Sequence, residues 1–230
     1  MAKRSPKQQR LNKRDSVERT RFYRFFYAVF APIIGLLFRI KVVGGENEPL
    51  NGGYVVCSNH IAASDPIMIC YALRHRQLRL MAKKELFSIP FLAPLIRSLG
   101  AFPIDRKGND VGAIRHGVEL VKQGRCLCIF PQGHRYPGVD PRTTKVKNGA
   151  ALIASRANAD ILPVYVLRKD NRPKLFGGVT VVIGKPFSLS EIVGETAEGG
   201  EYARLSAAIF DRICALGEQA RAEQEKGEQA

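Results

Sequence analysis

The chain has 230 residues, enough for one α/β domain with a full hydrophobic core and terminal extensions, or for two small domains. Hydrophobic residues make up 45% and charged residues 25%, which is ordinary for a globular protein, whereas the net charge of +15 is not. Such a basic chain implies an anionic partner: nucleic acid, an anionic membrane surface or phosphorylated small molecules. The five cysteines form no CxxC pair, so we expect reduced, buried thiols and no metal site.

The positive charge is concentrated in the leader and the body of the chain. Residues 1–24 hold nine Lys or Arg against two acids, whereas residues 191–230 hold four against nine. Residues 1–21 are polar and basic, and we expect them to form a disordered leader.

Residues 22–41 are predicted to form amphipathic helices in the membrane interface. The uncharged core from Phe25 to Phe38 has 14 residues, whereas a bilayer crossing needs about 20. Apolar residues recur on one helical stripe, and Pro32 is predicted to break or kink the segment into two short pieces. A core helix, an uncleaved signal peptide and a short span are the alternatives. No small-residue cleavage site follows, so we expect monotopic attachment at the cytoplasmic face of the membrane.

After the N-terminal segment, strand-like and helix-like runs alternate. This pattern predicts a single α/β domain over residues 42–216, with a mostly parallel central sheet flanked by helices. A polar tail over residues 217–230 is predicted to fray. The predicted strands are Ile40–Val43, Tyr54–Ser58, Leu78–Ala82, Ala101–Ile104, Cys126–Phe130, Ile161–Leu167 and Val179–Ile183. The predicted helices are Pro66–Leu73, Ile89–Leu99, Val111–Gln123, Asn148–Ala157 and Tyr202–Leu216.

A histidine and an aspartate follow the second predicted strand. Histidine titrates near pH 6.5, and a carboxylate that holds its tautomer makes it a general base at neutral pH. His60 and Asp65 can meet only if His60 lies on the loop and Asp65 at the helix start, because residues five apart on one helix point in different directions. Pro66 suits the first helical position and Asp65 the N-cap. In the alternative interpretation, Asp65 only caps the helix.

Two more strands end in arginines. Arg106 follows the apolar run Gly100–Asp105, and Arg135 follows a glycine-containing turn after Phe130. Ligands of parallel sheets bind at the carboxyl ends of the strands, and two guanidinium groups there could grip one phosphate. Both arginines could equally be solvated loop cations.

Together these segments resemble the glycerolphosphate acyltransferase family, in particular its bacterial 1-acyl-glycerol-3-phosphate acyltransferases. Asn59, His60 and Asp65 match the NHxxxxD motif of that family, and residues 100–106 resemble its second motif. Residues 130–135 resemble its FPEGTR motif, and residues 161–164 its apolar fourth block. The resemblance covers about residues 22–190, in the family's order and spacing.

The resemblance implies a chemistry for these residues. His60 would take the proton from the free hydroxyl of a lysophospholipid as it attacks an acyl thioester on coenzyme A or acyl carrier protein, and Asp65 would hold the imidazole. No cofactor beyond that co-substrate and no nucleic-acid partner is expected. The substrate-binding residues implied are Asn59, Arg106, Phe130, Pro131, Gln132, Gly133, His134 and Arg135.

One departure from the family pattern concerns the acceptor. The glutamate of the third motif is Gln132 here and its threonine is His134. Glutamine keeps a carbonyl acceptor, loses the charge and gains a donor. The acceptor could therefore be lysophosphatidate, a lyso-aminolipid or another lysophospholipid. The rival class is a non-catalytic protein of the same fold that binds lipid or nucleic acid. A serine hydrolase is disfavoured because no GxSxG elbow surrounds Ser58 or Ser64.

Overall fold

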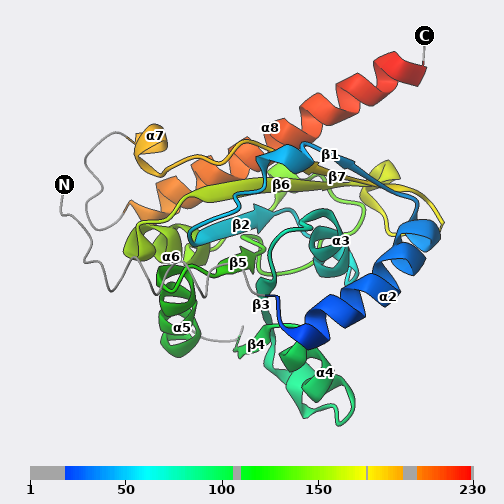
Figure 1. Ribbon diagram of the computed structural model, residues 1–230. Coiled ribbons are helices and arrows are strands. Elements are labelled where there is room, and N and C mark those ends of the chain that lie inside the picture. The colour runs from blue at the N-terminus through cyan, green and yellow to red at the C-terminus, as the bar shows by residue number, and fades with distance from the viewer. Residues whose placement is uncertain (1–18, 106–109, 175, 194–200, 229–230) are drawn as a thin grey trace.

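The computed structural model describes residues 19–105, 110–174, 176–193 and 201–228 (Figure 1). The strands are β1 (Ile40–Val43), β2 (Tyr54–Ser58), β3 (Leu78–Lys83), β4 (Ala101–Ile104), β5 (Cys126–Ile129), β6 (Ile161–Leu167) and β7 (Val179–Ile183). The helices are α2 (Arg21–Phe38), α3 (Asp65–Ala72), α4 (Leu92–Ser98), α5 (Val111–Lys122), α6 (Gly149–Ala157), α7 (Ser190–Val193) and α8 (Tyr202–Glu228). All seven predicted strands are confirmed, and β3 and β5 differ from their predicted ends by one residue.

The strands form one sheet in the order β1-β7-β6-β2-β5-β3-β4. Every pair is parallel except β6 with β7, so the prediction of a mostly parallel sheet is confirmed. β2 lies at the centre, between β5 and β6. The loops that follow β2, β5 and β6 therefore start side by side at one edge of the sheet.

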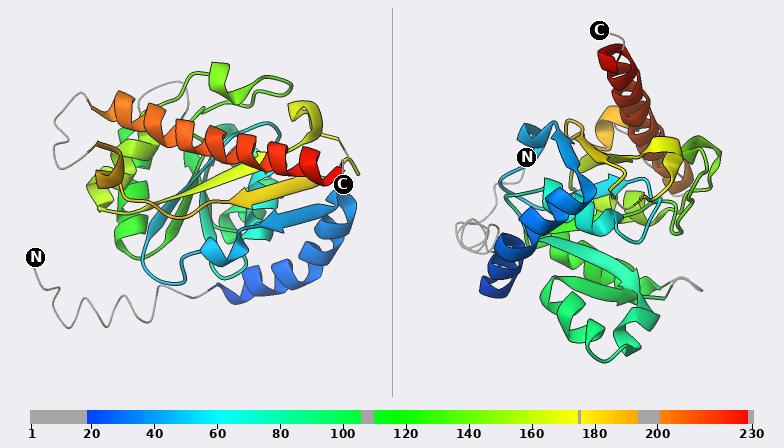
Figure 2. Two further views of the ribbon diagram at one scale, coloured as in Figure 1. Left: turned by 90° about the horizontal axis from the view of Figure 1, so that it is seen from above. Right: turned by 90° about the vertical axis from the view of Figure 1, so that its right-hand side faces the viewer.

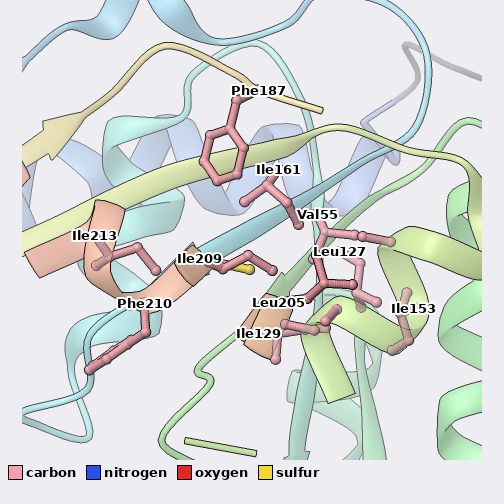
Figure 3. Close-up of a cluster of buried hydrophobic side chains, with 14 of the residues drawn as sticks. Val55, Leu127, Ile129, Ile153, Ile161, Phe187, Leu205, Ile209, Phe210 and Ile213 are labelled. Atoms are coloured by element: carbon pink, nitrogen blue, oxygen red, sulfur yellow. The ribbon is translucent and has the colours of Figure 1, made fainter. Parts of the chain in front are cut away.

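Side chains of the central strands alternate between two hydrophobic clusters, one on each face of the sheet. Val55 and Cys57 of β2 point into a cluster with α5, α6 and α8, whereas Tyr54 and Val56 point into a cluster with α3. Figure 3 shows the first cluster, in which Leu205 and Ile209 of α8 pack over the strands. Both faces are covered, as expected for a mainly parallel sheet.

Helix α2 lies along the second face and leaves most of its apolar side chains uncovered. Its partly buried Ile34 and Phe38 pack against the second cluster, and the Tyr27 hydroxyl donates to the Tyr71 carbonyl of α3 at 2.8 Å. Tyr23 is its buried residue. Large hydrophobic residues at the surface of this helix are Phe22, Phe25, Val29, Phe30, Ile33 and Leu36. By length and composition alone, this helix could cross a membrane.

Pro32 is predicted to break or kink the N-terminal segment into two short pieces, and the prediction of a break is wrong. Pro32 lies inside one helix that runs from Arg21 to Phe38, and the ribbon curves along its length (Figure 2). Proline removes one backbone donor from a helix. The helix stays continuous at Pro32, with helical turns on either side and packing of α2 on α3.

The prediction of a frayed polar tail is also wrong for residues 217–228, because α8 continues to Glu228 (Figure 1). Gly217 does not end the helix; a Cβ added there would lie 2.5 Å from the Tyr165 ring. The glycine lets α8 approach β6 closely. Beyond it Ala220 is buried, and Gln224 donates to the Thr180 hydroxyl of β7 at 2.9 Å.

Candidate active site

Asn59 and His60 follow the carboxyl end of the central strand β2. The Asn59 side chain continues the pairing of β2 with β6: its Oδ1 accepts from the Val166 N–H at 2.8 Å and its Nδ2 donates to the Val166 carbonyl at 3.1 Å. Asn59 is fully buried. The prediction that Asn59 binds substrate does not fit this geometry, because the amide is already occupied with the backbone of β6. Its position instead fixes where His60 leaves the sheet.

His60 and Asp65 meet as the sequence predicts. Nδ1 of His60 lies 3.0 Å from Oδ2 of Asp65, and both side chains are buried. The same oxygen accepts hydrogen bonds from the N–H groups of Ile61 at 2.6 Å and Ala62 at 2.7 Å. The loop from His60 to Asp65 therefore folds around one carboxylate oxygen. The prediction that Asp65 is the N-cap is wrong by one residue, because α3 begins at Asp65 and Ser64 is its N-cap.

This contact sets the tautomer of His60. An ionised carboxylate only accepts hydrogen bonds, so Nδ1 carries the hydrogen and Nε2 keeps its lone pair. Among the residues that the structure describes, none hydrogen-bonds Nε2 of His60. The imidazole can therefore accept a proton from a bound substrate through Nε2.

The loop after β5 holds His60 from the other side. The N–H of His60 donates to Oε1 of Gln132 at 2.7 Å, and its carbonyl accepts from the N–H of Tyr136 at 2.9 Å. The Phe130 ring stacks on the imidazole, with 4.0 Å between ring centroids. Both backbone groups and one ring face of His60 are thus held by one loop, which limits the movement of the base.

Gln132 uses both ends of its amide inside the protein. Its Nε2 donates to the Thr144 hydroxyl at 2.8 Å, and that hydroxyl in turn donates to the Pro141 carbonyl at 2.6 Å. Gln132 is 2% exposed. The prediction that Gln132 binds substrate therefore does not fit the structure; the amide supports the backbone of His60 instead. A glutamate here would lack the donor that Thr144 accepts.

A second charged side chain touches Asp65 and was missing from the sequence-based predictions. Arg168 directly follows β6, and its Nη2 lies 3.0 Å from Oδ1 of Asp65 and 3.0 Å from Oγ of Ser64. Arg168 is buried. A lone arginine after the buried strand Ile161–Leu167, which ends beside β2, is the signal that could have identified it.

The remaining residues predicted to bind substrate divide between the interior and the surface. Pro131 is buried, whereas His134 and Arg135 are exposed. Arg106 lies outside the described residues. Gly133 has φ +69°, and its N–H donates to the Phe130 carbonyl at 2.9 Å to close a turn. A Cβ added at Gly133 would lie 3.0 Å from the Lys147 side chain. The exposed Lys147, absent from the predictions, thus lies beside Arg135's loop.

A cavity of about 690 Å³ lies beside the loop that holds His60. It lies between α5 and α6 at the ends of β3, β4 and β5, and its lining is mainly apolar, including Met81, Ile104, Ile114 and Leu152. Phe130 forms part of the wall and stacks on His60, so one ring separates the cavity from the imidazole. Such a volume suits a small-molecule or lipid-chain ligand.

The cysteines have no role as nucleophiles in this geometry. All five are free, and all but the half-buried Cys70 are buried, so the predicted buried thiols are confirmed for four of them. Burial raises the pKa of Cys57, which is three residues before His60, and that of Cys126 to about 11. The reactive thiolate form is therefore scarce at neutral pH. Among the described residues, no three His, Cys, Asp or Glu side chains cluster to hold a metal ion.

Comparison with known proteins identifies the family of this chain. A family model described as Acyltransferase matches residues 39–167. The 1-acyl-sn-glycerol-3-phosphate acyltransferase of Bacillus subtilis is 30% identical over 166 residues, which cover 71% of this chain and 81% of that protein. The protein of the same name from Streptococcus pneumoniae is 34% identical over 151 residues, covering 64% of this chain and 55% of that protein.

A solved structure shares the fold. The crystal structure of the 1-acyl-sn-glycerophosphate (LPA) acyltransferase from Thermotoga maritima matches with a TM-score of 0.61 and 23% sequence identity. The match covers 90% of this chain and 87% of that one.

Proposed function

Because this chain belongs to the acyltransferase family, we propose that it moves a fatty acyl group from a thioester to the free sn-2 hydroxyl of 1-acyl-glycerol-3-phosphate, giving phosphatidate. The observation that carries this proposal is the 3.0 Å contact between Nδ1 of His60 and Oδ2 of Asp65, which leaves Nε2 as a base. The donor is acyl-CoA or acyl-carrier protein. No cofactor beyond that co-substrate takes part.

In the proposed reaction, Nε2 of His60 takes the hydroxyl proton of the acceptor as its oxygen attacks the thioester carbonyl. The resulting imidazolium is stabilised by the carboxylate of Asp65. The tetrahedral intermediate then collapses, the C–S bond breaks, and the proton leaves on the thiol. The new C–O bond is the ester of the product.

The acceptor headgroup needs cations, because a phosphate monoester carries a charge of about −1.5 to −2 at neutral pH. Arg135 lies on the loop that holds His60 and Lys147 lies beside it, and both are exposed, so their charged groups can contact a ligand from solvent. We assign binding of the phosphate headgroup to these two residues together with Arg106, His134 and the turn at Gly133. Arginine suits this role because its fork of donors can bind a phosphate bidentately.

The acyl chain of the donor fits the cavity between α5 and α6. The side chains of Ile104, Ile114 and Leu152 provide an apolar lining, and the cavity wall at Phe130 adjoins the imidazole. A thioester at this end of the cavity would lie on the other side of the Phe130 ring from the base. Burial of the chain contributes roughly 0.8 kcal/mol for each CH₂ group.

Helix α2 supports attachment to the membrane surface. Phe25 is 67% and Leu36 is 80% exposed, as expected for side chains that enter the lipid interface. Because α2 packs on α3, which carries Asp65, membrane contact would place the site close to its lipid substrate. We assign monotopic attachment at the cytoplasmic face, where the basic chain meets anionic lipid.

The test uses the purified full chain, a panel of lysolipids and both thioester carriers, with the acylated product identified by mass. We expect transfer to lysophosphatidate with the wild-type chain. The variant His60→Ala should lose roughly 10²–10⁴-fold in turnover while it still folds, with a lower melting temperature because a buried side chain is removed. Retained turnover in His60→Ala would refute the assigned base.

Two other outcomes of this panel identify the alternatives. Transfer only to a lyso-aminolipid or to another lysophospholipid would support the proposed mechanism and identify a different acceptor. No turnover with any acceptor, together with salt-sensitive binding to anionic vesicles or RNA, would indicate a non-catalytic binding protein.

A further inference from the structure

Arg168 is a charged side chain in the protein interior, at the point where β6 ends. The residue is 3% exposed and its guanidinium lies 3.0 Å from Oδ1 of Asp65. Its Nε atom is buried and has no hydrogen-bond partner among the described residues. Burying a guanidinium in this way is unfavourable unless a nearby anion compensates it. Asp65 is that anion, so the two buried charges depend on each other.

The two oxygens of Asp65 have different partners. Oδ2 accepts from His60, Ile61 and Ala62, whereas Oδ1 accepts from Arg168. The carboxylate therefore cannot rotate without losing a contact at one end. With His60 neutral, the charges of Asp65 and Arg168 cancel, and protonation of His60 makes the group positive.

We propose that Arg168 is a positioning residue that acts through Asp65: it orients the carboxylate and keeps His60 unprotonated, and thus usable as a base, at neutral pH. The inference rests on the proposed acyl transfer for its kinetic readout. Unopposed, the buried carboxylate of Asp65 would favour the imidazolium before substrate binds. The cation of Arg168 offsets part of that attraction.

In the part of the chain that the structure describes, the other groups around the imidazole carry no buried charge. Phe130 and Gln132, from the loop after β5, are uncharged side chains in contact with the ring and backbone of His60. His134 and Arg135 on the same loop and Lys147 before α6 are exposed, so solvent screens them. Asp65 from α3 and Arg168 from the end of β6 are therefore the buried charges beside His60 among the described residues.

The experiment compares Arg168→Met and Arg168→Lys with the exposed control Arg172→Met. For Arg168→Met we expect kcat at pH 7 to fall about three- to fivefold with little change in KM, because the acidic limb of the pH–rate profile moves up by roughly one pH unit. Arg168→Lys should restore much of both, because it keeps the charge. Arg172→Met should match the wild type.

A lower melting temperature in Arg168→Met with an unchanged kcat and pH profile would overturn the proposal and leave a structural role. If Arg168→Met does not fold, the pair Asp65→Asn and Asp65→Asn/Arg168→Met decides, since the double variant removes both charges. Arg168 acting through Asp65 predicts less than about a twofold difference in kcat between these two; a tenfold difference contradicts it.

A measurement without turnover separates this inference from the proposed function. NMR in the full chain follows the titration of the His60 ring, whose signals are assigned with His60→Gln. We expect the titration to move to higher pH in Arg168→Met and, to a lesser extent, in Arg168→Lys. An unchanged titration in both variants would overturn the proposal even if the wild-type chain transfers no acyl group to any acceptor. A shifted titration would support it in the same circumstance.

Discussion

The loops after β2 and β5 carry polar residues of two different kinds. After β2, Asn59, His60 and Asp65 are buried, and hydrogen bonds tie them to β6, to α3 and to the neighbouring loop. After β5, His134 and Arg135 are exposed on the surface of the loop that holds His60. The buried residues are held in one arrangement by their hydrogen bonds before substrate binds, whereas the exposed side chains can contact a ligand from solution.

This difference separates chemistry from binding. A general base is effective when its geometry is set in advance, which burial and a complete set of hydrogen bonds provide. A headgroup-binding cation must reach solvent, because a buried, unpaired guanidinium would be unfavourable in the empty site. We therefore expect changes in the buried group to lower kcat and stability, and changes in the exposed elements to weaken binding.

The largest effect is expected for Asp65→Asn in the buried group. An amide has no charge to stabilise the imidazolium that forms when His60 takes the proton. Its NH2 end would also face a donor, either the N–H groups of Ile61 and Ala62 or the guanidinium of Arg168. We expect kcat to fall by roughly 10³–10⁴-fold. Loss of the partner of Arg168 should also lower the free energy of unfolding by about 3–5 kcal/mol. Turnover and chemical denaturation of the same preparation measure both; an active, equally stable variant would contradict the assignment.

On the exposed side, Phe25→Ser combined with Leu36→Ser should weaken vesicle binding. Removing two large apolar side chains from a lipid interface loses about 1.5–3 kcal/mol each, which together is roughly 10²–10⁴-fold in partitioning. Activity on a short-chain, water-soluble lysolipid should persist, because the buried group is unchanged. Leu50→Ser serves as the control, since Leu50 is 55% exposed and is not part of α2. Equal binding by both variants in a vesicle sedimentation assay would argue against α2 as the membrane contact.

A smaller effect is expected for Arg135→Ala. Loss of one charge-assisted hydrogen bond to phosphate is equivalent to about 1.5–3 kcal/mol, or roughly 10–150-fold in KM for the acceptor. The thermal unfolding should not change, because Arg135 is exposed. Arg115→Ala, at an exposed position of α5, is the control. If kcat fell instead and KM stayed constant, Arg135 would belong with the chemistry rather than with binding.

The smallest effect is expected for Gln132→Glu, which tests whether the departure from the family motif selects the acceptor. A carboxylate still accepts from the N–H of His60, and the Thr144 hydroxyl can turn from the Pro141 carbonyl to donate to it. We expect less than about a tenfold change in kcat. Gln132→Leu, which leaves that N–H without an acceptor, should cost about 1–3 kcal/mol of stability. A large gain toward lysophosphatidate alone in Gln132→Glu would indicate a different native acceptor.

Local pattern was sufficient to predict the strands and the dyad. Runs of β-branched and apolar residues form buried strands in any parallel sheet, so the seven strands could be predicted from their composition. His60 and Asp65 are five residues apart, and a single short loop brings them together. Such contacts depend on the conformation of one segment and can be inferred without the rest of the fold.

Tertiary contacts decided what local pattern could not predict. Gly217 is a poor helix former and suggested an end, yet the close approach of α8 to Tyr165 requires a residue without a side chain there. Arg135 and Arg168 both follow buried strands, but one is exposed and the other is buried against Asp65.

The sequence by itself therefore determined the strands, the mostly parallel sheet and the meeting of His60 with Asp65, because these follow from residues that are near one another in the chain. The tertiary structure alone decided that Gln132 supports His60 from 72 residues away and that Arg168 pairs with Asp65 across 103 residues. A polar side chain is directed by the donors, acceptors and charges that folding places around it, and those neighbours come from distant parts of the chain.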